Sequence, residues 1–497
     1  MACARRAVID IGSNSVRLVI FEGPPRAPIA VFNEKSLCGL GDREPETGAL
    51  REGAMADALR ILRRFAALLA EDDVASLFVF ATAASREAPN GSEFLEEIRR
   101  IGFEPKLLSG EEEAHLAAFG ILSGAPEVLS EEGGAIAGDM GGGSLELSRL
   151  DGALAGGVAE VVSLPLGGLR LSTLYEGRMD EAKQAVNAAL GEVKWLRKSQ
   201  PSAFYIVGGA WRAIGRIAMA RADHPIPILD HYTMQRAEMI DLCRFVEQQS
   251  VESLEGMDSV QKRRAPTLPF AALVLRKVLQ KSGAPLVSVS SSGVREGALF
   301  AELSEQEREE DPLLLLCQHY AERLAPGDAV RRRQVYEFLS PLHEDETPRQ
   351  ARLRRAATKL TNIAGLFHPD TRGNEAAVSV LNMPFLSLDH PSRVALAAVL
   401  YQRHQSSPAT FPPHLHTELI DEGDILWAQR TGLALRFVAE FDPIGSAILP
   451  HAGLRRDADR LTLLLPEAQA AFLGETPERR FEKLAAAYGL EPAVERI

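Results

Sequence analysis

The sequence predicts an α/β protein with two successive α/β regions and a final all-α region. Short apolar runs alternate with helical apolar spacing from residue 1 to about 125. The same alternation starts again at about 126 and continues to 305, and the rest of the chain to residue 497 keeps only helical spacing. Alternating strands and helices are typical of layered α/β domains with buried parallel strands.

The first region begins with a hairpin, "VIDIGSNSVRLVIFEG" at 8–23, whose two apolar runs surround a turn of small residues. A helix is predicted for "REGAMADALRILRRFAALLAEDDV", because its apolar residues recur at helical spacing. A short buried strand at 77–80 follows, and then the helices "NGSEFLEEIRRIGF" and "SGEEEAHLAAFGILSG". Ser109 is the expected N-cap of the last helix, with acidic residues in its first turn.

The second region repeats this layout. "AIAGDMGGGSLELSRL" at 135–150 predicts two strands around a glycine turn, and "MDEAKQAVNAALGEVKWLRKS" predicts a helix. "FYIVGGAWRAIGRIAMARA" and "PLVSVSSSGVREGALFAEL" each predict a strand, a turn and a helix. The charged stretch "SEQEREEDP" at 304–312 then leads into the helical region.

Composition limits the function classes. The 46% hydrophobic and 25% charged content is that of an ordinary soluble protein, and no apolar run is long enough to span a membrane. The start has no separate apolar segment typical of a signal peptide, so we expect a cytoplasmic protein. The net charge of −13 argues against non-specific nucleic-acid binding. The spacing of Cys3, Cys38, Cys243 and Cys317 indicates neither a disulfide framework nor a zinc site.

The hairpin at 8–23 and the segment at 135–150 share one pattern: an apolar strand, an aspartate, a turn of glycine and hydroxyl residues, and a second strand. Asp10 precedes the first turn and Asp139 precedes the second. This repetition indicates an internal duplication. Backbone N–H groups and hydroxyls in such turns can bind phosphate oxygens, and an aspartate at a strand end can hold a divalent cation or a water. Two ordinary hairpins whose glycines adopt positive φ are the alternative.

These stretches resemble the exopolyphosphatase and guanosine pentaphosphate phosphatase family, within the actin, sugar-kinase and heat-shock-chaperone ATPase superfamily. The similar segments fall in order between residues 8 and 300: "DIGSNSVRLVI", "ATAASREAPN", "LSGEEEAHLAAFG", "GDMGGGSLEL", "SLPLGGLRL", "YIVGGAWRAIGRIA" and "SSGVREGAL". The resemblance implies two actin-like (ribonuclease H-like) domains around a cleft, at 1–125 and 126–305. It also implies hydrolysis of terminal phosphoanhydride bonds with a divalent metal, normally magnesium.

The resemblance assigns roles residue by residue. It implies metal ligation by Asp10, Asp139 and Glu146, with Glu146 also positioning water. Glu113 is implied as the general base, since it matches the second glutamate of the family motif, and Arg86 as a catalytic residue that contacts phosphate or transition-state charge. Phosphate binding is implied for Ser13, Asn14, Gly141, Gly142, Gly143, Ser144, Gly208 and Gly209.

Several of these residues have simpler alternatives. An ordinary surface arginine is the alternative for Arg86, and an exposed strand glutamate is the alternative for Glu146. Gly208 and Gly209 match the turn that receives adenosine in ATP-binding relatives. Trp211, which follows directly, either reshapes a nucleoside pocket there or is a core residue that opens a helix.

The helical region 306–497 resembles the HD-type phosphohydrolase domain of long family members. The diagnostic His-Asp pair would fall near Thr361 and Asn362, which cannot replace it as metal ligands. His368, Asp370, His390 and His404 lack metal-ligand spacing. We therefore expect a catalytically inactive domain that serves dimerisation, in a homodimer, or binding of the distal polyphosphate chain.

Basic runs at 262–264, 331–333 and 349–359 are compatible with a polyphosphate groove, or with solvated helix faces. We expect an exopolyphosphatase that releases orthophosphate from inorganic polyphosphate. Hydrolysis of guanosine pentaphosphate to the tetraphosphate is the closest alternative, because the motifs do not separate the two. An actin-fold kinase and a non-catalytic phosphate-chain sensor are further alternatives.

Overall fold

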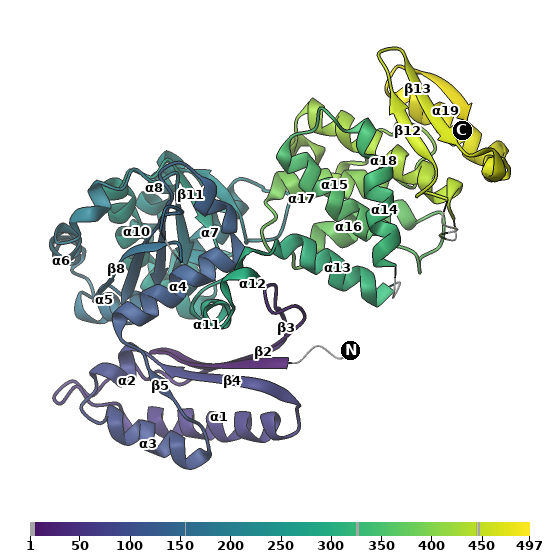
Figure 1. Ribbon diagram of the computed structural model, residues 1–497. Helices are drawn as coiled ribbons and strands as arrows, with labels where there is room; N and C mark the ends of the chain where they lie inside the picture. Colours follow the sequence, from purple (N-terminus) through teal and green to yellow (C-terminus); the bar gives the residue numbers. More distant parts are fainter. Residues whose placement is uncertain (1–4, 155, 325–327, 444, 446–447) are drawn as a thin grey trace. The chain divides into compact units, whose positions relative to one another are not determined.

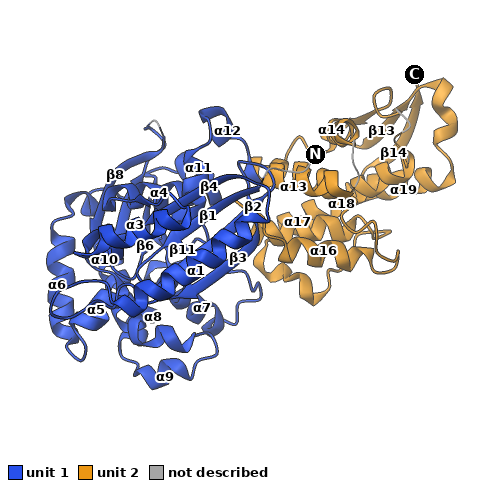
Figure 2. Cartoon of the chain, turned by 90° about the horizontal axis from the view of Figure 1, so that it is seen from below, with its two compact units in different colours: residues 1–312 blue, residues 313–497 orange. Residues whose placement is uncertain are grey.

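The computed structural model describes residues 5–154, 156–324, 328–443, 445 and 448–497. The chain divides into two compact units, Met1–Pro312 and Leu313–Ile497, coloured separately in Figure 2. Cys3 lies outside the described residues, whereas Cys38, Cys243 and Cys317 are buried and form no disulfide among the described residues. No helix that the described residues form combines the length and the apolar character needed to cross a bilayer.

The first unit contains two mixed sheets (Figure 1). The first sheet has the order β3-β2-β1-β4-β5, formed by β1 (Arg5–Ile11), β2 (Ser15–Glu22), β3 (Ile29–Leu37), β4 (Val74–Ala81) and β5 (Lys106–Leu107). The second has the order β10-β11-β9-β6-β7-β8, formed by β6 (Ala135–Met140), β7 (Leu145–Leu150), β8 (Val158–Leu164), β9 (Ala203–Val207), β10 (Thr233–Gln235) and β11 (Leu286–Val289).

The topology of the two sheets supports the predicted duplication. In each sheet the first hairpin strand pairs antiparallel with the second and parallel with the next strand along the sheet, β1 with β4 and β6 with β9. The registers also match: Asp10 pairs with Arg17 and Asp139 with Glu146, seven residues on in both hairpins. The two halves therefore share strand order, direction and register around their aspartates, but the residue opposite each aspartate differs in charge.

Helices cover both sheets. They are α1 (Glu52–Ala70), α2 (Ala83–Glu87), α3 (Gly91–Ile101), α4 (Gly110–Gly124), α5 (Gly168–Leu174), α6 (Met179–Gly191), α7 (Gly209–Arg221), α8 (Arg236–Glu247), α9 (Val251–Glu255), α10 (Leu268–Ser282), α11 (Val294–Ala301) and α12 (Glu305–Glu309). Phe65 of α1 and Phe94 of α3 pack on one face of the first sheet, against Ile9 and Leu18. The predicted boundaries at 125/126 and 305/306 stay predictions.

Helices α4 and α11 form a layer between the two sheets. Phe300 of α11 and Ile121 of α4 pack with Ala137 of the second sheet. Ala298 and Leu299 of α11 pack with Val8, Val19 and Phe80 of the first sheet. One helix pair therefore supports both halves of the duplication.

Glycines allow the two helices to touch backbone to backbone. A Cβ at Gly297 would lie 1.8 Å from the carbonyl oxygen of Leu116, and a Cβ at Gly120 would lie 2.3 Å from that of Gly293. Real Cβ atoms do not approach so closely, so any larger residue at either position forces the helices apart.

The second unit is helical up to residue 441 and then forms a small sheet. Its helices are α13 (Pro312–Leu324), α14 (Ala329–Phe338), α15 (Pro348–Leu360), α16 (Arg372–Asn382), α17 (His390–Gln402), α18 (Glu422–Phe441) and α19 (Glu475–Ala487). The sheet, in the order β12-β13-β14, consists of β12 (Gly453–Arg456), β13 (Arg460–Leu465) and β14 (Glu491–Arg496).

This sheet corrects the expectation of an entirely helical C-terminal region. Only β13 buries most of its side chains, whereas β14 is exposed along almost its whole length and β12 buries one residue. Two of the three strands therefore carry no apolar alternation that a sequence pattern could reveal.

Several arginines of the basic runs in this unit form ion pairs, whereas Arg333 and Arg355 are exposed. Arg332 pairs with Glu322 at 2.9 Å, Arg349 with Asp424 at 2.7 Å and Arg354 with Glu346 at 2.7 Å. Removing one partner from a buried pair leaves the other charge uncompensated. These arginines therefore serve the packing of the unit.

We expect Gly297→Ala to destabilise the first unit by about 1–3 kcal/mol or more, because the added methyl group overlaps the Leu116 carbonyl. Gly53→Ala is the matched control: a Cβ there has nothing within 4 Å, and alanine favours a helix over glycine. Chemical denaturation of both variants measures the difference. Equal unfolding free energies would contradict the backbone contact.

Candidate active site

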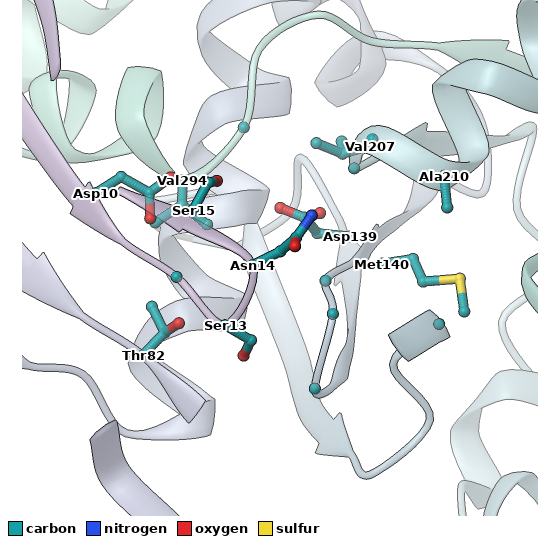
Figure 3. A pocket seen from close by; sticks show the side chains of 18 of the residues that line it. Asp10, Ser13, Asn14, Ser15, Thr82, Asp139, Met140, Val207, Ala210 and Val294 are labelled. Carbon is teal, nitrogen blue, oxygen red and sulfur yellow. The ribbon is translucent and has the colours of Figure 1, made fainter. Parts of the chain in front are cut away.

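A cavity of about 440 Å³ lies in the first unit, where the two aspartate turns meet. Figure 3 shows Asp10, Ser13 and Asn14 entering it from the first hairpin and Asp139 from the second sheet. Its walls carry four carboxylates and seven cationic side chains. The carboxylates are Asp10, Glu113, Asp139 and Glu146, and the cations are Arg17, Lys35, Arg212, Arg216, Arg263, Arg264 and Arg295.

The first turn (12–15) and the second turn (141–144) lie against each other. A Cβ at Gly142 would be 3.3 Å from the Ser13 Cβ, and one at Gly143 would be 3.2 Å from the Ser13 Oγ. Neither glycine has a positive φ, so the conformational explanation for the glycines of the second turn does not hold. Close approach between the two turns is the reason for small residues here.

Gly208 closes the site on the side of the second sheet. Its φ is +92°, and a Cβ would lie 2.3 Å from the Met140 carbonyl oxygen and 2.9 Å from Asp139 Oδ1. Both the conformation and the space require glycine at this position. Gly209 lies directly under Arg264, whose Nη1 would be 2.2 Å from an added Cβ.

Trp211 is a core residue. Its ring is fully buried in the core of the second sheet, and its Nε1 donates to the Ala271 carbonyl oxygen at 3.0 Å. The ring therefore does not reshape a nucleoside pocket. The group that covers the Gly208-Gly209 turn is the Arg264 guanidinium.

The three glutamates of the first turn of α4 have different surroundings. Glu112 accepts from the Ser109 backbone N–H at 2.8 Å, while the Ser109 hydroxyl caps the helix as predicted. Glu111 is exposed, and Glu113 lines the cavity. Helical geometry explains this split, since successive residues point about 100° apart around the axis.

Burial raises the pKa of Glu113 to about 7. Arg86 opposes this increase, whereas the negative charges of Asp139 and Asp10 add to it. A carboxylate with such a pKa can exchange a proton near neutral pH, which suits a general base.

Arg86 lies beside Glu113 and is not among the described residues that line the cavity. Its Nη1 donates to the Leu108 carbonyl oxygen at 2.6 Å and to Glu113 Oε2 at 3.5 Å. Its contacts in the structure are therefore with Glu113 and the Leu108 carbonyl oxygen, and the phosphate contact that the resemblance implied stays a prediction.

Glu146 is 2% exposed, so the alternative of an exposed strand residue is wrong. Ser163 Oγ donates to its Oε1 at 2.9 Å, and Ser144 provides a second side-chain hydrogen bond. Burial, and then the charge of Glu113, raise its pKa well above the usual range. Ser163 also contacts Gly110 at the start of α4, so it links Glu146 to the helix that carries Glu113.

Asp10 and Asp139 fit a hard divalent cation. Burial raises the pKa of both carboxyl groups, that of Asp139 to about 6, and their mutual repulsion adds to the rise for Asp139. Magnesium is commonly held by one or two carboxylates together with phosphate oxygens and water. Within the described ranges no three His, Cys, Asp or Glu side chains gather into a metal-holding group, so an ion here would also need oxygens from substrate and solvent.

Sequence reasoning missed most of the Lys and Arg side chains that line the cavity. Arg17 lies opposite Asp10 in the hairpin register, and Lys35 belongs to the neighbouring strand. Desolvation and nearby guanidinium groups lower the pKa of Lys35 to about 8. Arg295 belongs to "SSGVREGAL", one of the segments that resemble the family. Arg17 and Lys35 have the sequence pattern of ordinary strand residues, and only the strand register brings them to the cavity.

Comparisons with known proteins agree with this fold. Residues 19–306 match the model of the Ppx/GppA phosphatase family, and residues 337–493 match that of the exopolyphosphatase C-terminal domain. Exopolyphosphatase 1 of Mycobacterium tuberculosis is 24% identical over 321 residues, which cover 61% of this chain and 89% of that protein. Retrograde regulation protein 2 of Saccharomyces cerevisiae is 24% identical over 489 residues, which cover 88% of this chain and 81% of that protein.

Solved structures support the actin-like two-domain fold of the first unit. A Ppx/GppA family member from Aquifex aeolicus has a TM-score of 0.52 at 24% identity, covering 62% of this chain and 99% of its own. An exopolyphosphatase from Cytophaga hutchinsonii has a TM-score of 0.54 at 21% identity, covering 60% of this chain and 97% of its own. The chain belongs to the Ppx/GppA phosphatase family.

Proposed function

We propose that this phosphatase is an exopolyphosphatase, which hydrolyses the terminal phosphoanhydride bond of inorganic polyphosphate. The observation that carries the proposal is that one cavity combines four carboxylates, Glu113 among them, with seven Lys and Arg side chains. A linear polyanion with no apolar part suits such a lining. Phe80 is the single aromatic residue among the described lining residues, which disfavours stacking of a guanine base.

In the proposed mechanism, the backbone N–H groups and hydroxyls of the two turns hold the terminal phosphoryl group. Glu113 orients a water molecule and accepts its proton as the water oxygen attacks phosphorus. The bond to the bridging oxygen breaks, and orthophosphate and a chain shorter by one phosphate result. Ser163 and Ser144 hydrogen-bond to Glu146, whose carboxyl group interacts with that of Glu113. A negative charge on Glu146 favours proton uptake by Glu113.

A divalent ion held by Asp10 and Asp139 would neutralise charge on the phosphate oxygens when bound. Arg295 faces both aspartates and opposes the rise in their pKa, so it keeps part of their charge balanced. The homodimer stays a prediction.

Hydrolysis of guanosine pentaphosphate is the second candidate, since the family includes it. The Arg264 guanidinium lies over Gly209, so the group beside that turn is a cation. A cation there favours binding of a phosphate chain over binding of a nucleoside. Phosphate release from long polyphosphate, tripolyphosphate and guanosine pentaphosphate, measured side by side with magnesium, distinguishes the two. Preference for guanosine pentaphosphate over both polyphosphates would reverse our assignment.

Glu113→Gln should lower kcat on long polyphosphate by about 100-fold or more while substrate binding persists, because the amide cannot accept the proton. Glu111→Gln is the matched control, because Glu111 lies two residues earlier in the first turn of the same helix and is exposed. Steady-state phosphate release measures kcat, and equilibrium binding measures affinity. Unchanged turnover in Glu113→Gln would exclude it as the base.

Activity should fall as the pH decreases through about 7, because only the carboxylate form of Glu113 can accept a proton and burial raises its pKa to about 7. Arg86→Gln removes a charge that lowers this pKa, so the acidic limb of the kcat profile should move to higher pH. Arg60→Gln, on the exposed surface of α1, serves as the control. An unmoved limb in Arg86→Gln would contradict the electrostatic coupling.

Arg263→Gln and Arg264→Gln should each raise KM for long polyphosphate several-fold and weaken the salt dependence of KM. Both residues line the cavity, so each substitution removes one positive charge that attracts the polyanion. Lys262→Gln is the neighbouring control, since Lys262 is exposed and is not among the lining residues. Kinetics over a range of ionic strengths give both quantities. An equal effect of all three substitutions would point to a general charge effect.

A further inference from the structure

A loop outside the cavity supports the first turn. Residues 38–43 follow β3 and are not among the described residues that line the cavity, and we call them the supporting loop. The Gly41 N–H of this loop donates to the Ser13 carbonyl oxygen at 2.6 Å. Two further N–H groups of the loop donate to the Asn14 carbonyl oxygen at 3.3 Å each. The first turn is therefore held through its carbonyl groups.

The start of α5 supports the second turn in the same way. The Gly168 N–H donates to the Gly141 carbonyl oxygen at 3.1 Å. The Arg170 N–H donates to the Gly142 carbonyl oxygen at 3.0 Å. A Cβ at Gly167 would lie 2.4 Å from that same oxygen, so the two backbones touch. The second turn is therefore also held through its carbonyl groups.

The two supports set the direction of N–H groups in both turns. In a trans peptide, the carbonyl group and the N–H of the next residue point to opposite sides. A carbonyl that is held by its support therefore turns the next N–H away from that support. Four such N–H groups result, and all of their residues line the cavity: Asn14, Ser15, Gly142 and Gly143. One phosphate group can accept from both turns only when the spacing between the turns is correct.

The supports also contact each other across the two halves of the duplication. A Cβ at Gly41 would lie 3.1 Å from Leu169 Cδ2, and a Cβ at Gly142 would lie 3.7 Å from the Leu169 Cβ. The Leu169 side chain of α5 therefore lies between the supporting loop and the second turn. Through this contact, the position of one support affects the position of the other.

An ion-pair bridge joins the same segments, and we define it as Arg43 of the supporting loop, Glu87 of α2 and Arg170 of α5. Arg43 Nη2 donates to Glu87 Oε2 at 3.4 Å. It also donates to the Ala83 and Ala84 carbonyl oxygens of α2, at 3.1 and 3.2 Å. Arg170 Nη2 donates to the same Glu87 Oε2. One carboxylate oxygen therefore holds a cation from each half of the duplication.

The position of α2 gives the bridge access to the turns. A Cβ at Gly143 of the second turn would lie 3.2 Å from the Ala83 Cβ of α2. The side chains of Arg170 and Glu87 are 25% and 36% exposed, and an ion pair with this exposure contributes little to the stability of a fold. Removing the bridge should therefore leave the unit folded and change only the spacing of the segments that it joins.

We propose that Glu87 and Arg170 are positioning residues, whose ion pair fixes the spacing between the two turns so that N–H groups of both bind one phosphate group. Neither residue is among the described residues that line the cavity, so both act through the turns. The proposal rests on the part of the proposed function in which the two turns hold a phosphate group. It does not require that the phosphate come from polyphosphate.

Calorimetric titration with orthophosphate, in the presence of magnesium, tests the proposal. Glu87→Gln, Arg170→Gln and the double variant should each weaken orthophosphate binding about three- to fivefold, because each change breaks the same ion pair. Arg178→Gln is the matched control and should leave the affinity unchanged, since Arg178 pairs with Glu181 at 2.9 Å within the second half alone.

The two single variants separate positioning from a general charge effect. Arg170→Gln removes a positive charge and Glu87→Gln removes a negative one, so charge alone would change the affinity for an anion in opposite directions. Positioning predicts weaker binding in both. Arg170→Lys keeps the ion pair and should recover part of the affinity, and thermal unfolding verifies that each variant is folded.

Three results would overturn the proposal. They are opposite effects of the two single variants, additive effects in the double variant, and an orthophosphate affinity of Arg170→Gln equal to that of Arg178→Gln. Absence of orthophosphate binding by the unsubstituted chain would overturn it as well, because the turns would then hold no phosphate.

Turnover of tripolyphosphate distinguishes this proposal from the proposed function. Arg170→Gln should raise KM more than it lowers kcat, because the turns hold the phosphate before and during the reaction, whereas Glu113→Gln should lose kcat. Orthophosphate binding that depends on Arg170, in a chain that does not hydrolyse tripolyphosphate, would refute the proposed function and support the positioning role. Hydrolysis with the same KM in Arg170→Gln and Arg178→Gln would refute the positioning role alone.

Discussion

The backbone contact between α4 and α11 is the constraint on which the active site depends. Gly297 against Leu116, and Gly120 against Gly293, allow two helices to fit as one thin layer between the two sheets. The same layer carries Glu113 at the start of α4 and Arg295 at the start of α11. Glu113, its charged neighbours and the two aspartate turns are therefore fixed relative to one another by packing.

The duplication is symmetric in backbone and asymmetric in charge. Asp10 faces Arg17 across its hairpin, whereas Asp139 faces Glu146 across the equivalent pair of strands. Both halves nevertheless contribute charges of each sign to the cavity. The first supplies Asp10, Glu113, Arg17 and Lys35, and the second supplies Asp139, Glu146, Arg212, Arg216, Arg263, Arg264 and Arg295. The proposed function, which holds a polyanion and deprotonates water, needs both kinds of group.

The helical unit neutralises several of its basic residues by internal pairing. Arg354 pairs with Glu346 at 2.7 Å, and both side chains are buried. Arg403, just after α17, instead donates to the Thr361 hydroxyl at 2.6 Å. A run of basic residues in the sequence does not separate these cases, because helix packing sets which partner each arginine meets.

The sequence by itself determined the alternation of strands and helices, the two aspartate turns and the Ser109 cap, because these depend on local spacing and local hydrogen bonds. Tertiary structure decided which charges meet. Arg17, Lys35 and Arg264 reach the cavity through strand register and helix packing, Trp211 lies in the core, and β12 and β14 form without apolar patterns. Such outcomes depend on partners distant in the chain, whose contacts no local pattern encodes.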